Sequence, residues 1–327
     1  MKAIVMNGFG EAEVLALGEI PDPVPGPGEL LVRIRATALN RADLLQRQGL
    51  YPPPAGAPAT LGLEMSGEVA VVGPGCAGWK VGERVCALLP GGGYAQFVTI
   101  PADMALPVPR HLSHEQAAAI PEVFLTAYLN LFRLGGLTPE KSVLIHAGAS
   151  GVGTAAIQLV RAAGARSWVT AGTLEKIQSC IALGAVAGWD HHQGSFVPWV
   201  MEQTRGRGVD LILDFIGAPY LADNLQALAQ DGRLNIIGTL GGAQAADFNL
   251  GTLMAKRLTI QATTLRSQSV AAKVALNREF RDFAWPRFAS QELVPLVDRV
   301  FGWTEAAQAH RYMESNANTG KIVLRVD

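Results

Sequence analysis

The sequence has few cysteines, and their spacing gives neither a metal-binding pattern nor a redox pair. Its 327 residues contain three, Cys76, Cys86 and Cys180, which lie far apart and form no Cys-x-x-Cys motif. An odd number of widely spaced cysteines provides no disulfide framework. We therefore expect reduced, partly buried thiols and a cytoplasmic protein.

Long apolar runs and an excess of one charge are missing as well. No stretch approaches the roughly 20 uninterrupted apolar residues of a membrane-spanning helix. The N-terminal segment MKAIVMNGFGEAEVL has neither the long apolar run nor the cleavage site of a secretory signal, so we expect none. The net charge of −1 gives no reason to expect nucleic acid or a membrane as a partner.

A ligand pattern for a metal ion is also absent. Of the six histidines, His111 and His114 lie three apart, but no cysteine or carboxylate pattern completes a zinc site around them. His146 lies inside an apolar run, where we expect a packed, hydrogen-bonded core role. No Gly-x-Ser-x-Gly elbow, Cys/His pair or flavin motif stands out. We therefore predict no metal ion and no nucleophilic mechanism.

The first part of the chain has the pattern of a β-rich domain. Up to about residue 120, short runs such as LLVRIRATA and GEVAVVG alternate with Gly- and Pro-rich turns such as PDPVPGPGEL. Many short strands punctuated in this way predict a compact β-rich domain or a partly open barrel.

After residue 120 the patterns of helices and strands alternate. Segments 121–132 and 152–164 have apolar residues three and four apart, as helices do. Other runs are apolar throughout, which is typical of parallel strands buried on both faces. These runs are 142–148, 166–172, 209–217, 233–242 and 257–265. The sequence therefore predicts an α/β, doubly wound parallel-sheet domain over 121–265.

The end of the chain returns to the first pattern. A helix is predicted over 274–288 and a strand over 320–327. We expect this C-terminal tail to rejoin the N-terminal part, which gives one domain over 1–120 and 266–327.

A glycine-rich loop between an apolar strand and a helix is the strongest chemical signal. The loop consists of Gly148, Ala149, Ser150, Gly151, Val152 and Gly153. Glycines at its two ends allow a tight turn and close helix–sheet packing, and a pyrophosphate would bind the N–H groups at the helix start. Ser150 stands where the usual pattern has a second glycine. We expect it to displace the cofactor slightly or to hydrogen-bond a phosphate or the nicotinamide ribose.

The end of the second strand of this domain predicts which dinucleotide binds. NAD-binding proteins carry an acid there for the ribose 2′-hydroxyl. Here the end reads Gly172-Thr173-Leu-Glu175-Lys176, with neutral groups at the tip and a lysine within one helical turn. Neutral and basic groups suit a 2′-phosphate, although Glu175 is near and Lys176 can be a solvated surface residue. The pattern favours NADPH.

Several segments together resemble one family along the whole chain. They are ALNRADLLQRQG (38–49), YPPP (51–54), LGLEMSG (61–67), LPGGG (89–93), AIPE (119–122) and IHAGASGVGTAAIQ (145–158). With them the chain resembles the medium-chain dehydrogenase/reductase superfamily, in particular its zinc-free quinone oxidoreductase branch, which includes zeta-crystallin. It looks most like the p53-inducible type.

The resemblance implies an architecture and a zinc-free site. It implies a GroES-like catalytic domain formed by both termini around a Rossmann domain, with the active site in the cleft between them, and a homodimer. Zinc-dependent members carry a cysteine near the position of Asn40 and a Gly-His-Glu where this chain has Gly62-Leu63-Glu64. Both ligands are replaced, which agrees with the ligand count.

The resemblance also assigns residues to NADPH. Beyond the glycine-rich loop, these are Asn40, Thr126, Gly172, Thr173, Lys176, His191, Gly217, Gly238, Thr239, Leu240, Leu265 and Asn318. Relatives often have a tyrosine beside the 2′-phosphate where this chain has His191. The histidine can donate a hydrogen bond there, or it can be a solvated loop residue.

Three residues are the catalytic candidates: Asn40, Tyr51 and Ser150. The phenol of Tyr51 precedes a stiff Pro-Pro-Pro run and can stack on a flat substrate and donate a hydrogen bond to a quinone oxygen. Packing of Tyr51 on the proline turn is the alternative. Asp43 and Glu64 can carry charge into the cleft or serve as structural hydrogen-bonding groups.

The resemblance implies direct hydride transfer from NADPH to a quinone or another electron-poor carbonyl compound. Reduction of the activated C=C bond of an enal or enone uses the same geometry and is the alternative. A non-enzymatic alternative is a crystallin-like or RNA-associating protein, against which the phosphate-loop glycines, Tyr51 and the near-neutral charge argue.

Overall fold

The computed structural model describes residues 1–245 and 248–327 and divides the chain into two compact units. The first unit comprises Met1–Leu125 and Arg266–Asp327, and the second comprises Thr126–Leu265. The division falls within helix α3 (Pro121–Tyr128). Each unit contains a hydrophobic cluster of its own.

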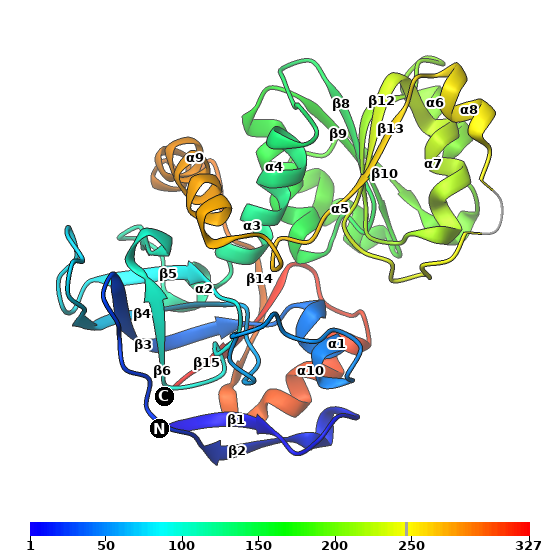
Figure 1. Ribbon diagram of the computed structural model, residues 1–327. Coiled ribbons are helices and arrows are strands. Elements are labelled where there is room, and N and C mark those ends of the chain that lie inside the picture. Colours follow the sequence, from blue (N-terminus) through cyan, green and yellow to red (C-terminus); the bar gives the residue numbers. More distant parts are fainter. Residues whose placement is uncertain (246–247) are drawn as a thin grey trace. The chain divides into compact units, whose positions relative to one another are not determined.

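The second unit is built on a six-stranded sheet (Figure 1). Its strands are β8 (Ser142–Ile145), β9 (Arg166–Ala171), β10 (Ala187–Asp190), β11 (Val209–Asp214), β12 (Leu228–Ile236) and β13 (Thr259–Ala262). They are ordered β10-β9-β8-β11-β12-β13, and every neighbouring pair is parallel. The order reverses between β8 and β11, which is the switch point where doubly wound sheets bind ligands. The predicted fold class is confirmed.

Helices cover both faces of this sheet. They are α4 (Gly151–Ala162), α5 (Leu174–Leu183), α6 (Val197–Gln203), α7 (Leu221–Ala227) and α8 (Leu250–Ala255). Trp168 of β9 packs in the cluster that includes Val200 of α6 and Leu225 of α7. The next residue, Val169, lies on the other face, where it and Ile177 of α5 leave room only for Gly188. The alternation of side chains along a strand thus places different helices on opposite faces.

The sequence pattern does not predict strand β10. Its four residues, AGWD, are all half-buried rather than fully buried, because the strand lies at the edge of the sheet. A short edge strand has no apolar run to distinguish it from a loop. This strand is nevertheless important, because it carries Asp190 and His191 to the same edge as the end of β9.

The first unit is β-rich, as predicted. Its strands are β1 (Lys2–Met6), β2 (Leu15–Glu19), β3 (Glu29–Ala38), β4 (Glu64–Val72), β5 (Arg84–Leu88), β6 (Phe97–Pro101), β7 (Leu106–Pro107), β14 (Val297–Gly302) and β15 (Lys321–Arg325). The main sheet is ordered β14-β15-β3-β4-β5-β7, with β6 also paired to β3. β15 pairs antiparallel with β3, so the C-terminal tail rejoins the N-terminal part.

Helices of the first unit complete this part of the fold. They are α1 (Arg41–Arg47), α2 (His114–Ala118), α9 (Val270–Ala289) and α10 (Ala306–Glu314). Within the described residues, no helix is long and apolar enough to cross a membrane. All three cysteines are free thiols, as expected, and Cys86 and Cys180 are buried.

Candidate functional site

The predicted cofactor residues of the second unit collect at one edge of its sheet. The carboxyl ends of parallel strands share an edge, and ligands of doubly wound folds bind outside it. The predicted residues follow these ends: 148–153 after β8, Gly172 and Thr173 after β9, His191 after β10, Gly217 after β11, Gly238, Thr239 and Leu240 after β12, and Leu265 after β13. Two further residues of this unit lie on helices, Thr126 on α3 and Lys176 on α5.

The glycine-rich loop after β8 has no room for side chains at its two ends. A Cβ at Gly148 would lie 2.6 Å from Cβ of Val169, and a Cβ at Gly153 would lie 2.5 Å from the carbonyl oxygen of Gly148. The first glycine thus lets the loop approach the neighbouring strand, and the second lets α4 pack against the loop. These are the roles that a dinucleotide-binding turn requires of its glycines.

Ser150 caps the helix that follows. Its backbone is extended, and its Oγ accepts a hydrogen bond from the Gly153 N–H at 3.1 Å. A capping serine accepts with its oxygen and keeps its own O–H as a donor. The start of α4 combines this donor with free N–H groups and the positive end of the helix dipole, which suit a pyrophosphate.

The end of β9 lies beside His191. A Cβ at Gly172 would be 3.1 Å from Nε2 of His191, so a side chain there would crowd the ring. Thr173 caps α5 by accepting the Lys176 N–H at 3.2 Å. Burial, and next the neighbouring His192, lower the pKa of His191, while Asp190 opposes the shift.

The loops after β11 and β12 are joined at the same edge. Gly217 has a positive φ of 87°, and its Cβ would lie 2.7 Å from the carbonyl oxygen of Gly242. Asp214 holds the first loop by accepting the N–H groups of Ile216 and Gly217 at 2.7 and 3.1 Å. Leu240 is 56% exposed, which leaves an apolar side chain available to a flat ligand.

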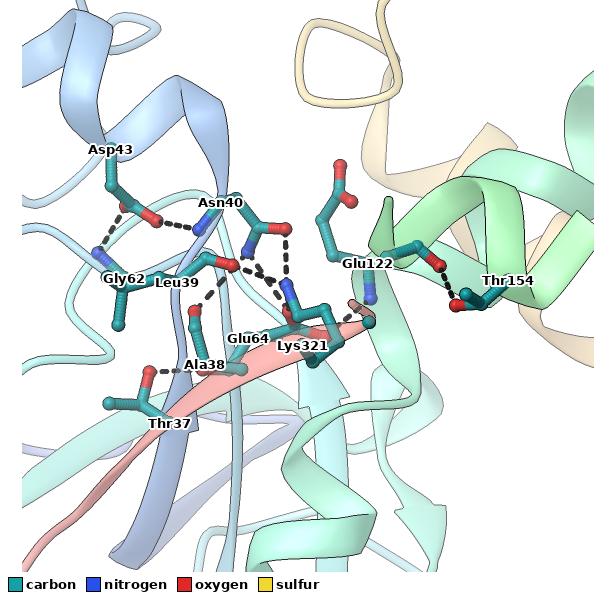
Figure 2. Close-up of polar contacts among 12 residues, drawn as sticks. Thr37, Ala38, Leu39, Asn40, Asp43, Gly62, Glu64, Glu122, Thr154 and Lys321 are labelled. Carbon is teal, nitrogen blue, oxygen red and sulfur yellow. Dashed lines mark hydrogen bonds and ion pairs between the residues drawn. The ribbon is translucent and has the colours of Figure 1, made fainter. Parts of the chain in front are cut away.

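In the first unit, Asp43 holds two backbone segments together (Figure 2). Its two carboxyl oxygens accept the N–H of Asn40 at 2.8 Å and the N–H of Gly62 at 2.9 Å. Asp43 is fully buried, and burial raises its pKa to about 6 against the effect of those hydrogen bonds. Its contacts assign it a structural role.

A buried ion pair lies beside this group. Nζ of Lys321, from β15, lies 2.8 Å from Oε1 of Glu64, the first residue of β4. The same ammonium donates to Oδ1 of Asn40 at 2.7 Å and to the carbonyl of Leu39. Glu64 is completely buried and its Oε2 also accepts the N–H of Glu122 at 2.8 Å. All three ammonium protons of Lys321 therefore have acceptors.

The side-chain amide of Asn40 is held on both sides by this pair. Its Nδ2 donates to Oε1 of Glu64 at 3.0 Å and to the carbonyl of Ala38 at 3.3 Å, while its Oδ1 accepts from Lys321. Both N–H groups are thus occupied within the protein. Within the described residues, no three or more His, Cys, Asp or Glu side chains are grouped to hold a metal ion.

Tyr51 lies in the loop after α1, half-buried, and its ring faces Arg266. Cζ of Arg266 lies 5.4 Å from the ring centroid, which is a cation–π distance. The Tyr51 hydroxyl has no hydrogen-bond partner in the described part of the chain. Burial raises the pKa of Tyr51, and the positive charge of Arg266 opposes that shift.

The remaining candidate residues lie outside the groups described above. His146 is completely buried and hydrogen-bonds Thr170 at 2.9 Å and Asn224 at 2.7 Å, so the predicted core role is confirmed. Asn318 is half-buried and donates to the carbonyl of Gly320 at 2.8 Å. A cavity of about 450 Å³ in the first unit is lined by neither Asn40 nor Tyr51. That Asn40, Tyr51 and Ser150 meet at one site stays a prediction, because Ser150 belongs to the second unit and the other two residues to the first.

Sequence reasoning does not identify Lys321 or Arg266. Both lie more than 200 residues from their partners Asn40 and Gln46, and a single charged residue in a strand or loop carries no local signal. The expected return of the C-terminal strand to the first domain places Lys321 near β3, but no pattern shows that its side chain turns inward.

Two family models match the chain. One, described as an alcohol dehydrogenase GroES-like domain, matches residues 26–110, and the other, described as a zinc-binding dehydrogenase, matches 151–279. The chain is 32% identical over 347 residues to the human synaptic vesicle membrane protein VAT-1 homolog, covering 99% of this chain and 86% of that protein. It is 35% identical over 319 residues to the phthioceranic/hydroxyphthioceranic acid synthase of Mycobacterium tuberculosis. That match covers 97% of this chain but 15% of the much longer synthase.

Several solved structures are similar to the chain over its full length. An NAD-dependent alcohol dehydrogenase is 33% identical with a TM-score of 0.90, covering 100% of both chains. Escherichia coli quinone oxidoreductase complexed with NADPH is 30% identical with a TM-score of 0.88, covering 99% of this chain and 100% of that one. The CurK enoyl reductase is 26% identical with a TM-score of 0.89, covering 100% and 99%.

The chain therefore belongs to the medium-chain dehydrogenase/reductase superfamily. Its first unit contains the GroES-like domain and its second the Rossmann-type sheet. The neighbours named above differ in cofactor and in acceptor.

Proposed function

We propose that the protein is an NADPH-dependent reductase that delivers hydride directly to a quinone, without metal or flavin, and works as a homodimer. The observation that carries the proposal is the chemistry around Asn40. In this chain Asn40 and Leu63 stand where zinc-dependent members of the superfamily place ligands, and Asn40 is bound by Lys321. Alcohol oxidation uses a metal ion to polarise the oxygen, so a chain without those ligands suits an acceptor that is already electrophilic.

The second unit provides a cradle that fits a dinucleotide. Its glycines exclude side chains at the turn, and the start of α4 supplies N–H groups and the Ser150 hydroxyl for the pyrophosphate. Gly172 and Thr173, not an acid, stand at the tip of β9, and we expect Lys176 and His191 to face a 2′-phosphate there, which favours NADPH over NADH. The nicotinamide, when bound, supplies the hydride.

Tyr51 is the residue of the first unit best suited to contact the acceptor. Its hydroxyl is unpartnered within the described residues, and the positive charge of Arg266 beside the ring opposes the rise in the pKa of Tyr51 that burial causes. A half-buried phenol offers a flat face to a quinone ring and a donor to its oxygen.

Reduction of an activated C=C bond is the second candidate. The structural similarity to the CurK enoyl reductase favours it, because the same hydride geometry serves an enal, an enone or an enoyl compound. A donor to the carbonyl oxygen would stabilise the enolate just as it would a reduced quinone.

The test is NADPH oxidation with a panel of ortho- and para-quinones, enones and simple alcohols. We expect turnover with quinones, and the Tyr51→Phe variant should lose about 10- to 100-fold in kcat while keeping its affinity for NADPH. Tyr312→Phe is the matched control, because its hydroxyl is exposed and bonded to Asp298 at 2.9 Å. Turnover of enones alone would favour the second candidate, and no NADPH consumption with any acceptor would refute both. Light scattering checks the dimer.

A further inference from the structure

Arg266 is a buried cation without a carboxylate partner. Only 7% of its surface is exposed, yet it forms no ion pair with any described residue. An arginine keeps its proton under all ordinary conditions, so the charge remains in the protein. Burying a charge without a counter-ion costs free energy and needs a reason.

Part of the guanidinium is occupied by structural contacts. Nε and Nη2 donate to the carbonyl oxygen of Pro90 at 3.0 and 2.7 Å, and Nη2 also donates to Oε1 of Gln46 at 2.8 Å. These bonds tie Arg266 to the loop after β5 and to α1. They account for three of the five N–H groups.

The remaining nitrogen, Nη1, has no partner. It is inaccessible to water and makes no hydrogen bond within the described part of the chain. Its two N–H groups are therefore unused donors on a group that carries a full positive charge. A buried, charged donor without a partner costs more free energy than a typical hydrogen bond contributes. A ligand that accepts a hydrogen bond from Nη1 therefore removes this cost when it binds.

The surroundings of Arg266 place this donor next to the catalytic candidate. Cζ of Arg266 lies 5.4 Å from the centroid of the Tyr51 ring, and among the described residues the Tyr51 hydroxyl has no partner either. The charged groups near Arg266 are Asp43, which attracts it without direct contact, and Lys273, whose Nζ donates to the Arg266 carbonyl at 2.6 Å. A third charged group, Glu122, acts on Tyr51 and raises its pKa, so the positive charge at this pair of residues is that of Arg266 itself.

We propose that Nη1 of Arg266 and the hydroxyl of Tyr51 form an oxyanion-binding site for the acceptor's carbonyl oxygen. The inference rests on the proposed reductase function: the reduction places negative charge on the acceptor's oxygen, and Arg266 is the cation that would stabilise it. The acceptor gains a hydride, that is two electrons and one proton, as NADPH becomes NADP⁺. Its oxygen then carries the negative charge until the product takes one proton from solvent. Arg266 stabilises that charge as it develops, so it is a catalytic residue rather than a residue that only positions the loop.

Binding of a coloured phenol tests the site without turnover. 4-Nitrophenol resembles the reduced acceptor, and its phenolate is distinguished from the phenol by absorbance. We expect the protein to lower the pKa of bound 4-nitrophenol and Arg266→Gln to abolish that shift. Arg278→Gln is the matched control, because Arg278 is exposed on α9 and pairs with Asp103 at 3.3 Å. An unchanged shift in folded Arg266→Gln would overturn the proposal.

Kinetics supply the second measurement. Arg266→Gln should lose about 100-fold or more in kcat with unchanged NADPH affinity, as removal of an oxyanion donor does. A deuteride isotope effect from labelled NADPH should increase, since the hydride step becomes slower. If Arg266→Gln fails to fold, Arg266→Lys is the second variant. Its ammonium can replace the contact with Pro90 but not Nη1, so the shift in the pKa of bound 4-nitrophenol should still decrease. Wild-type turnover in that variant would refute the inference. A protein that consumes no NADPH yet binds phenolate through Arg266 would refute the reductase function alone.

Discussion

Replacing Lys321 by methionine should strongly destabilise the first unit. The side chain is 4% exposed, and its ammonium contacts Oε1 of Glu64, Oδ1 of Asn40 and the carbonyl of Leu39. Methionine fills most of the space but strands a carboxylate that is completely buried. Removing one partner of a buried ion pair costs about 3–5 kcal/mol of the free energy of unfolding.

A second variant separates the charge from the packing. In Lys321→Met/Glu64→Gln no charge is left stranded, and the amide oxygen of the introduced glutamine can still accept one of the hydrogen bonds that Glu64 accepts, from Asn40 or from the N–H of Glu122. We expect the double variant to be more stable than Lys321→Met alone by about 1–2 kcal/mol of the free energy of unfolding, because no uncompensated charge remains buried.

The assay is urea unfolding combined with hydrogen exchange of β3 and β15, so that the first unit is measured separately from the second. Lys80→Met is the control, because Lys80 is exposed. A loss below about 1 kcal/mol in Lys321→Met, or a double variant no more stable than the single one, would show that Lys321 and Glu64 do not form a buried ion pair.

Three further predictions concern the cofactor and the metal. Lys176→Glu should reverse or erase the preference for NADPH in fluorescence titrations, and equal affinity of the unmodified protein for both cofactors would contradict this assignment. The pKa of His191 is lowered in the free protein, whereas a bound 2′-phosphate would raise it, so NADPH binding takes up a proton. Affinity for NADPH should therefore fall as the pH rises from the pKa of His191 in the free protein to its pKa in the complex. The fall should be smaller in His191→Gln, and the affinity for NADH should not show it. Activity should be indifferent to chelators, and copurified metal that tracks with activity would refute this.

The doubly wound sheet could be predicted because its central strands are apolar throughout and its helices are amphipathic. β8, β9 and β11 lie in the middle of the sheet, so burial on both faces selects the residues that reveal them. β10 escapes because an edge strand is half-buried, and β12 begins at Leu228, five residues before the apolar run that predicts it. Local composition therefore predicts the fully buried strands more readily than the half-buried ones.

The candidate site was predictable only where its residues are contiguous. The loop from Gly148 to Gly153 carries its whole signal within six residues, because the turn, the helix cap and the anion site are made by one segment. The site in the first unit is made by long-range pairs instead. Glu64, in β4, meets Lys321 in β15, and Tyr51, in a loop, meets Arg266 just before α9. No spacing rule connects residues that only the sheet topology brings together.

The contacts of Asn40, a predicted catalytic residue, leave its side-chain amide with no free donor. Both of its amide N–H groups are donated to Glu64 and Ala38, and Lys321 binds its oxygen, so one lone pair of Oδ1 is all that remains for a ligand. It cannot donate to an acceptor oxygen unless the buried pair around it rearranges. An Asn40→Ala variant would remove one acceptor from Lys321 and one donor from Glu64. A loss of turnover in that variant would therefore report the disturbed ion pair, whereas the loss in Tyr51→Phe or Arg266→Gln would report missing donors to the acceptor itself.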